Sequence, residues 1–246
     1  MDLKIVETSL NLRVERKLGK VLKDYSLSKN VAIEQLKLEA DVYCNLEYME
    51  CNTSEYMEAF STAGYIPYKG LDASQRGIMC MVKKEYPVKI LHILTEPHML
   101  HLQIEKEGLI LDIISIKILV AGSDDTDYIG RKEQWDRVLD YLDSIKTKNL
   151  CIVGNLNHGV ISQNYGEQNA RRFFNYQILL ESLKKKEIKV VPINGTSYRG
   201  YLKIDHLCIS DNLRVVKAEY LNLFGKHRII GVPNHSLLVA NLRVCK

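Results

Sequence analysis

Short runs of apolar residues, many of them alternating with polar ones, recur along almost the whole chain. Runs of this length are typical of β-strands, and the Gly, Pro, Asn and Asp residues between them are typical of turns. The pattern predicts strands over 3–10, 41–46, 77–82, 86–94, 99–104, 109–120, 149–153, 188–192, 204–209, 213–221 and 236–244.

A helical pattern is clearest over 129–146, where Trp135, Val138 and Leu142 recur at three- and four-residue steps. Such spacing places apolar side chains on one face of an amphipathic helix. Three weaker helical patterns cover about 28–39, 54–63 and 168–186. Because strands outnumber helices and the helices fall between groups of strands, the order of elements predicts a mixed, largely antiparallel α+β fold and not a Rossmann fold.

Length and composition fit one folded domain over 1–246. Hydrophobic residues make up 46% of the chain and charged residues 26%, which is ordinary for a soluble globular protein. The formal charge of +4 is compatible with a polyanionic ligand but too small to identify one. No window approaches the roughly 18 apolar residues of a membrane span. The six cysteines form no Cys-x-x-Cys pair, so we expect core thiols and a cytoplasmic location.

The most informative feature is a set of short polar segments at the ends of apolar strands. Active sites of layered α/β proteins are often built from such segments, which lie on loops held by a rigid scaffold. The segments are Ser9-Leu10-Asn11, Glu47, Gly154-Asn155-Leu156-Asn157, Ile204-Asp205-His206 and Pro233-Asn234-His235.

The order and spacing of these segments resemble the endonuclease/exonuclease/phosphatase superfamily, which includes exonuclease III and DNase I. That family has strands ending in Trp-Asn and Gln-Glu, then Gly-Asp-Phe-Asn, Ile-Asp-Tyr and finally Ser-Asp-His before the last strand. The resemblance covers essentially residues 3–244. It implies a four-layer α/β sandwich in which two mainly antiparallel sheets pack face to face with helices outside.

Four positions match the family's functional residues. The resemblance implies that Glu47 is the metal-binding glutamate and Asn157 the substrate-orienting asparagine. It also implies that His235 is the catalytic histidine and that Asp205 is the aspartate paired with it.

Three further functional positions are changed. Ser9 stands where the family has Asn, Asn155 where it has the proton-handling Asp, and Asn234 where it has a second metal-ligating Asp. An experimenter would choose Asp-to-Asn changes to trap a substrate, but the change at Ser9 favours a naturally degenerate site.

The substitutions matter because phosphodiester hydrolysis needs a cation on the phosphoryl oxygens, an activated water and a proton for the leaving oxygen. An asparagine keeps the shape of an aspartate and loses its charge, while Mg²⁺ prefers anionic oxygen ligands. We therefore expect weak or absent binding of Mg²⁺ or Mn²⁺. Loss of the acid–base group at position 155 would reduce the rate on the order of 10²–10⁴-fold.

Five other residues are candidates for substrate binding. Arg131 resembles the arginine that begins the family's Arg-x-x-Gln helix, and His158 directly follows Asn157. Tyr198, Arg199 and Tyr201 lie in a glycine-flanked loop shortly before Asp205, where the tyrosine rings could stack on bases. Packing against neighbouring residues is an equally good interpretation of these tyrosines.

Two hypotheses follow for function. The first is a metal-dependent phosphodiester hydrolase of nuclease type with impaired or absent activity. The second is a non-catalytic protein that uses the same cleft to bind nucleic acid, another phosphorylated ligand or a protein partner. The fold does not decide between them, since function depends on the site.

Overall fold

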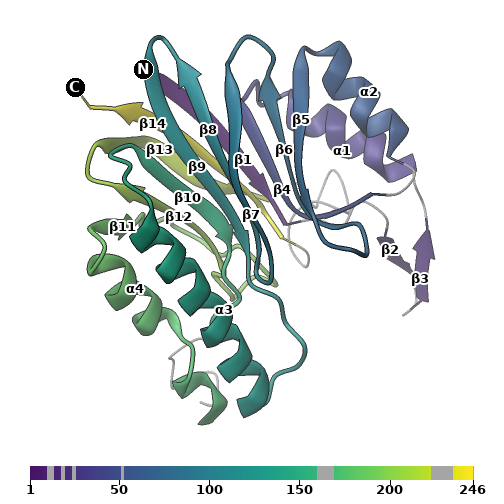
Figure 1. Ribbon diagram of the computed structural model, residues 1–246. Coiled ribbons are helices and arrows are strands. Elements are labelled where there is room, and N and C mark those ends of the chain that lie inside the picture. Colours follow the sequence, from purple (N-terminus) through teal and green to yellow (C-terminus); the bar gives the residue numbers. More distant parts are fainter. Residues whose placement is uncertain are drawn as a thin grey trace.

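The computed structural model describes residues 1–9, 14–17, 20–23, 26–50, 53–159, 169–222 and 235–245. Within this part of the chain, two six-stranded sheets form the centre of the molecule (Figure 1). The first sheet has the order β13 (Leu213–Leu221), β14 (Leu237–Val244), β1 (Asp2–Thr8), β4 (Val42–Met49), β6 (Arg76–Lys83), β5 (Tyr65–Leu71). The second has the order β11 (Ile188–Val190), β12 (Asp205–Ser210), β10 (Leu150–Asn155), β9 (Leu109–Lys117), β8 (His98–Lys106), β7 (Val88–Thr95).

Most neighbouring strands are antiparallel, and each sheet contains one parallel pair, β1 with β4 and β10 with β9. A separate hairpin joins β2 (Val14–Lys17) to β3 (Lys20–Lys23). This topology confirms the predicted two-sheet sandwich with mainly antiparallel sheets.

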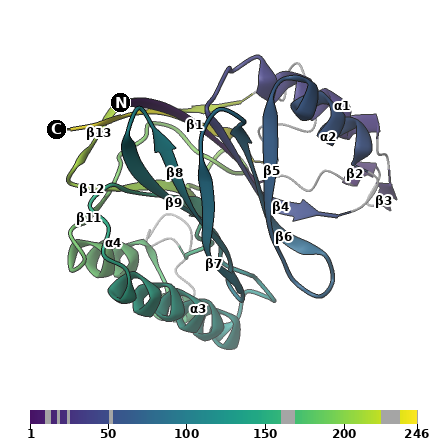
Figure 2. The same cartoon turned by 45° about the horizontal axis from the view of Figure 1, so that its top comes forward.

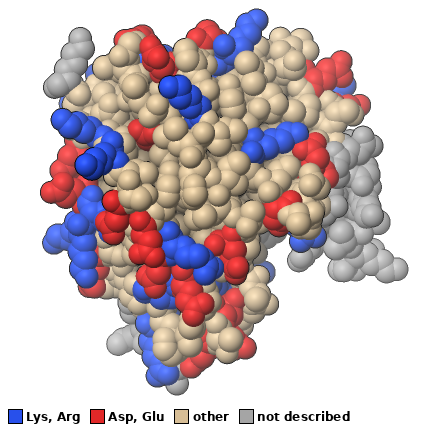
Figure 3. Space-filling view, viewed as in Figure 1, with Lys and Arg blue, Asp and Glu red and all other residues tan. Residues whose placement is uncertain are grey.

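Helices cover the outer face of each sheet, so that the molecule has four layers (Figures 1 and 2). The first sheet is covered by α1 (Ser26–Leu36) and α2 (Ser54–Thr62), and the second by α3 (Asp125–Ser144) and α4 (Tyr176–Lys184). Over α3 and α4 the charged side chains of both signs are interspersed (Figure 3) and form ion pairs such as Lys132 with Asp136 and Lys186 with Asp143. None of the helices in the described ranges is long and apolar enough to cross a membrane.

The central core lies between the two sheets and is made by alternate residues of each strand. Leu3 and Ile5 of β1, for example, meet Leu207 and Ile209 of β12 in one buried cluster. The intervening residues point outward to the helices, as Val6 does. This period of two is the reason why the strands were predictable from their alternation.

The structure differs from the predicted elements at three places, one of which is the hairpin of β2 and β3, where no strand was predicted. The strand β5 was missed because Pro67 and Gly70 interrupt its pattern, which an edge strand tolerates. The helix predicted over 168–186 is divided into a short 3-10 helix, η2 (Asn169–Arg172), and α4. The division occurs where the Asn175 side chain accepts a hydrogen bond from Ile178 N and thereby caps α4.

Buried cysteines confirm the interpretation of the thiols as core residues. Cys44, Cys80, Cys151 and Cys208 are all buried within the two sheets and carry free thiols. The prediction is wrong for Cys245, which is exposed just after the last strand, and Cys51 lies outside the described residues.

Candidate functional site

Polar side chains replace apolar ones where the inner rows of both sheets end. The inward-facing positions of β1 lead from Leu3 and Ile5 to Glu7, and those of β9 lead from Leu111 and Ile113 to Lys117. In the second sheet, Asn155 pairs with both Asp205 and Lys117. The ion pair of Lys117 with Glu47 joins this edge to the first sheet, in which β1 lies beside β4. We call this set the polar end; it comprises Glu7, Arg76, His98, Lys117, Asn155, Asp205 and Ser236.

A hydrogen bond joins two residues of the candidate catalytic set, Asp205 and His235. His235 Nδ1 lies 2.8 Å from Asp205 Oδ2, and the Tyr198 ring stacks on the imidazole with 4.4 Å between ring centroids. Burial raises the pKa of Asp205, but the His235 imidazole and the Ser197 hydroxyl outweigh it, so that the pKa is lowered overall. Asp205 is therefore an ionised carboxylate that orients the imidazole.

Glu7 is a second buried carboxyl group at the polar end, and the sequence interpretation missed it. Its Oε1 accepts a hydrogen bond of 3.0 Å from the Ser9 hydroxyl, while Oε2 has no partner among the described residues. Burial, and next the nearby charge of Asp205, raise the pKa of Glu7 well above its ordinary value. The pKa values of two buried carboxyl groups of one site are thus shifted in opposite directions, which favours the protonated form of Glu7 and the ionised form of Asp205.

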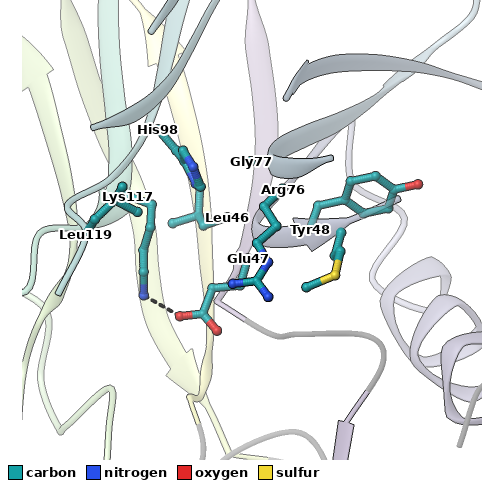
Figure 4. A pocket seen from close by; sticks show the side chains of 9 residues that line it. Leu46, Glu47, Tyr48, Arg76, Gly77, His98, Lys117 and Leu119 are labelled. Atoms are coloured by element: carbon teal, nitrogen blue, oxygen red, sulfur yellow. Dashed lines mark hydrogen bonds and ion pairs between the residues drawn. The ribbon is translucent and has the colours of Figure 1, made fainter. Parts of the chain in front are cut away.

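Glu47 forms an ion pair with Lys117, which connects β4 in the first sheet to β9 in the second (Figure 4). Both side chains line a pocket of about 150 Å³ together with Arg76, His98 and Tyr48. The Lys117 charge also favours the ionised forms of Glu7 and Asp205. The Lys117 ammonium therefore acts on three carboxyl groups, those of Glu47, Glu7 and Asp205.

The two asparagines after β10 are held by the chain itself. Asn155 is fully buried, and its Oδ1 accepts a hydrogen bond of 3.2 Å from Asn157 N. Asn157 has a positive φ of 41° and donates from Nδ2 to Ile118 O at 2.7 Å. The Nδ2 of Asn155 has no partner in the described part of the chain.

Arg131 and His158 lie beside this segment and not in the Glu47 pocket. The Arg131 guanidinium pairs with Asp127 and donates to the carbonyl oxygens of Asn157 and Gly122. His158 Nε2 lies 2.8 Å from His206 Nε2, and burial lowers the pKa of His158 to about 4 and that of His206 to about 3. Arg131 and His158 therefore hold the loop after β10 in place through hydrogen bonds to other groups of the protein.

The loop with Tyr198, Arg199 and Tyr201 lies against His235. Arg199 has a φ of 53° and places its guanidinium 5.0 Å from the centroid of the Tyr198 ring. Tyr201 is 45% exposed. Of these three residues, Tyr198 therefore contacts the candidate catalytic set directly.

Most predicted site residues thus lie along one edge of the sandwich. Asn234 lies outside the described residues. A sequence signal for the missed Glu7 does exist, because it is the residue at which the inward-facing apolar row of β1 becomes polar, and Lys117 is the first charged residue of the inward-facing row of β9.

The donors near Glu47 do not fit a magnesium ion. Mg²⁺ requires near-octahedral oxygen ligands, usually including one or two carboxylates. The Glu47 carboxylate is taken by the Lys117 ammonium, and position 155 offers a neutral amide. No group of three His, Cys, Asp or Glu side chains in the described ranges could hold a metal ion.

Replacing Glu7 with Gln is expected to raise the melting temperature at pH 8. The native state resists ionisation of Glu7, so its contribution to stability is present below pH 4.5 and is lost as the pH rises through the raised pKa. Gln removes that loss and keeps an acceptor for Ser9. Melting curves should show a gain of a few degrees at pH 8, at about 2–4 °C per kcal/mol. An equal gain at pH 4 would contradict the assignment of a neutral Glu7.

No protein-family model matches the sequence, and no curated protein matches it. Solved structures match over nearly the whole chain. An endonuclease/exonuclease/phosphatase from Beutenbergia cavernae is 13% identical with a TM-score of 0.70, over 99% of this chain and 72% of that one. D. rerio TDP2 complexed with single strand DNA product is 12% identical with a TM-score of 0.66, over 99% of each chain.

The endonuclease domain of TRAS1, a telomere-specific non-LTR retrotransposon, is 14% identical with a TM-score of 0.64, and each chain is covered completely. Identities this low carry the likeness of the fold and not of the residues at the site. The chain therefore has the fold of the endonuclease/exonuclease/phosphatase proteins.

Proposed function

We propose that this protein binds phosphodiester groups of nucleic acid at the polar end and hydrolyses them slowly or not at all. One observation carries the proposal: the Asp205–His235 pair is intact, with 2.8 Å between its atoms, beside an amide at Asn155 where hydrolysis would use a carboxylate. Hydrogen-bonding groups for a phosphate are thus kept, while a group for moving protons is missing.

Nucleic acid is favoured over other phosphoesters by the comparisons and by the residues near His235. One structural neighbour was solved with single-stranded DNA product. Here Tyr198 stacks on His235, and the exposed ring of Tyr201 lies three residues further along the same loop. Aromatic side chains beside a phosphate site bind single strands by stacking on bases, largely independently of sequence.

Impaired hydrolysis follows from the chemistry of the groups present. His235, oriented by Asp205, is a suitable proton donor or acceptor. However, an amide at position 155 cannot exchange a proton with water, and the Glu47 carboxylate is neutralised by Lys117. The second candidate, a metal-dependent hydrolase with residual activity, is favoured by the retention of Glu47, Asp205 and His235.

A hydrolysis assay separates the two candidates. Single- and double-stranded DNA and RNA are incubated with Mg²⁺ or Mn²⁺ and either the natural chain or the triple variant Ser9→Asn, Asn155→Asp, Asn234→Asp. We expect no more than trace hydrolysis by the natural chain and an increase on the order of 10²–10⁴-fold if the acid–base group is restored. His235→Ala in the triple variant is the control, because any true activity should require the imidazole.

The binding proposal has its own measurement. Fluorescence anisotropy of a labelled single-stranded oligonucleotide should show binding that weakens with added salt, as expected for phosphate contacts. Turnover by the natural chain at the rate of the triple variant would contradict the proposed impairment. Absence of binding to every nucleic acid tested would refute the proposed function.

A further inference from the structure

The Glu47 pocket contains two cationic side chains and one carboxylate. Lys117 and Arg76 reach the pocket from β9 and β6, and Glu47 lies between them in the view of Figure 4. Glu47 forms an ion pair with Lys117, whereas no ion pair of the Arg76 guanidinium occurs among the described residues. The lining therefore carries one positive charge more than it can neutralise internally.

Lys117 is held where its charge acts on the whole polar end. The side chain is only 13% exposed, and its ammonium favours ionisation of both Glu7 and Asp205. Its backbone is fixed in the sheet by pairing with His98 on one side and Asn155 on the other. A resident ammonium thus supplies a positive charge next to the carboxylate that the family resemblance assigns to metal binding.

Among the described residues, the remaining lining adds no carboxylate beside that of Glu47. His98 is buried, and its Nε2 lies 3.2 Å from Asp72 Oδ2, which fixes the imidazole. A single water needs only roughly 10–15 Å³, and the pocket of about 150 Å³ therefore admits a phosphate-sized group. Arginine binds phosphate through paired donors, and lysine binds it as a point charge.

We infer that the Lys117 ammonium replaces a divalent cation at Glu47, and that Lys117 and Arg76 together bind a phosphate group without metal. This inference rests on the proposed function, which it deepens by naming the phosphate site and its cations. A metal site and an ammonium site predict opposite effects on phosphate binding when the Glu47 charge is removed. A metal site needs the Glu47 charge, whereas in an ammonium site that charge competes with the phosphate for Lys117.

The experiment measures binding of a labelled oligothymidylate at constant ionic strength, once with EDTA and once with Mg²⁺. We expect equal affinity in both, a loss of about tenfold in Lys117→Met and in Arg76→Met, and recovery in Lys117→Arg. Glu47→Gln should bind a few-fold more tightly in EDTA. Lys189→Ala is the matched control, because it removes a lysine–aspartate ion pair from the edge strand β11.

Inorganic phosphate separates failure of this inference from failure of the proposed function. In EDTA it should raise the melting temperature of the natural chain but not of Lys117→Met or Arg76→Met. Arg76 is exposed, so this second variant remains folded even if Lys117→Met does not. Phosphate-dependent stabilisation without oligonucleotide binding would refute only the nucleic-acid function. Oligonucleotide binding that requires Mg²⁺ and is lost in Glu47→Gln would overturn the ammonium site alone, and binding of neither probe would overturn both.

Discussion

Replacing Asp205 with Ala is expected to lower the free energy of unfolding by about 3 kcal/mol. Removal of one partner from a buried ion pair costs roughly 3–5 kcal/mol, and we take the lower end because the partner left behind is an imidazole and not a permanent charge. The Asp205 side chain is fully buried and that of His235 is 9% exposed, so water does not compensate for the lost hydrogen bond.

This effect follows from the place of the pair in the fold. Asp205 begins β12, and Ser236, next to His235, donates from its backbone N to Ser197 O at 2.8 Å. Ser197 in turn accepts hydrogen bonds from the backbone N atoms of Ile204 and Asp205. The pair therefore connects the start of β14 to the loop before β12.

Denaturant unfolding of Asp205→Ala should be compared with that of Asp211→Ala. Asp211 forms an exposed ion pair with Lys189, and exposed pairs contribute little to stability. Nitrogen NMR of His235 supplies the second readout, since loss of Asp205 removes the acceptor for Nδ1–H. If both variants unfold alike and the His235 tautomer does not change, the Asp205–His235 pair contributes nothing to stability and the expectation is wrong.

The second large effect is a loss of stability in mild acid caused by the buried His158–His206 pair. Both pKa values are lowered by burial, to about 4 and about 3, so the native state resists protonation that the unfolded chain accepts below about pH 6.5. Stability is therefore fully present above pH 6.5 and falls as the pH decreases toward 4. Between pH 6.5 and 5 the loss is at most about 2 kcal/mol for each imidazole.

The geometry of the pair explains why neither ring is protonated easily. Only one of the two Nε2 atoms can carry the shared hydrogen, and a second proton there would create repulsion. His158 Nδ1 is already 2.9 Å from Gly159 O, and Tyr176 packs against both rings. Both rings are buried, so water does not stabilise a positive charge on either of them.

Unfolding free energies measured from pH 7.5 to pH 4.5 test this expectation. The double variant His158→Phe, His206→Phe should lose much less stability over this range than the natural chain does. Carboxylates such as Asp112 and Asp127, whose pKa values are lowered, affect stability only below about pH 3.8 and thus outside this window. Glu7, whose pKa is raised, gains stability as the pH falls in the same window, so the comparison is made in the Glu7→Gln variant. In that variant, equal stability at pH 7 and pH 5 would contradict the assignment.

The sequence by itself determined most of the strands and the mixed α+β class, because alternating apolar positions encode which face of each strand is buried, whereas the four-layer arrangement was implied by the family resemblance. The same alternation located the ends of strands at which the site is built, including Asp205 and Asn155. It failed at β5, where Pro67 and Gly70 obscure the period and only pairing with β6 makes the segment a strand.

Tertiary structure alone decided how the polar residues interact. Lys117 and Glu47 are 70 residues apart, and no local pattern predicts that their strands, in different sheets, face each other. Similarly, the pKa of Glu7 is raised only because folding buries the carboxyl group and brings Asp205 close. Periodicity records burial along one strand, whereas the charge balance of the site depends on which strands the packing of two sheets brings together.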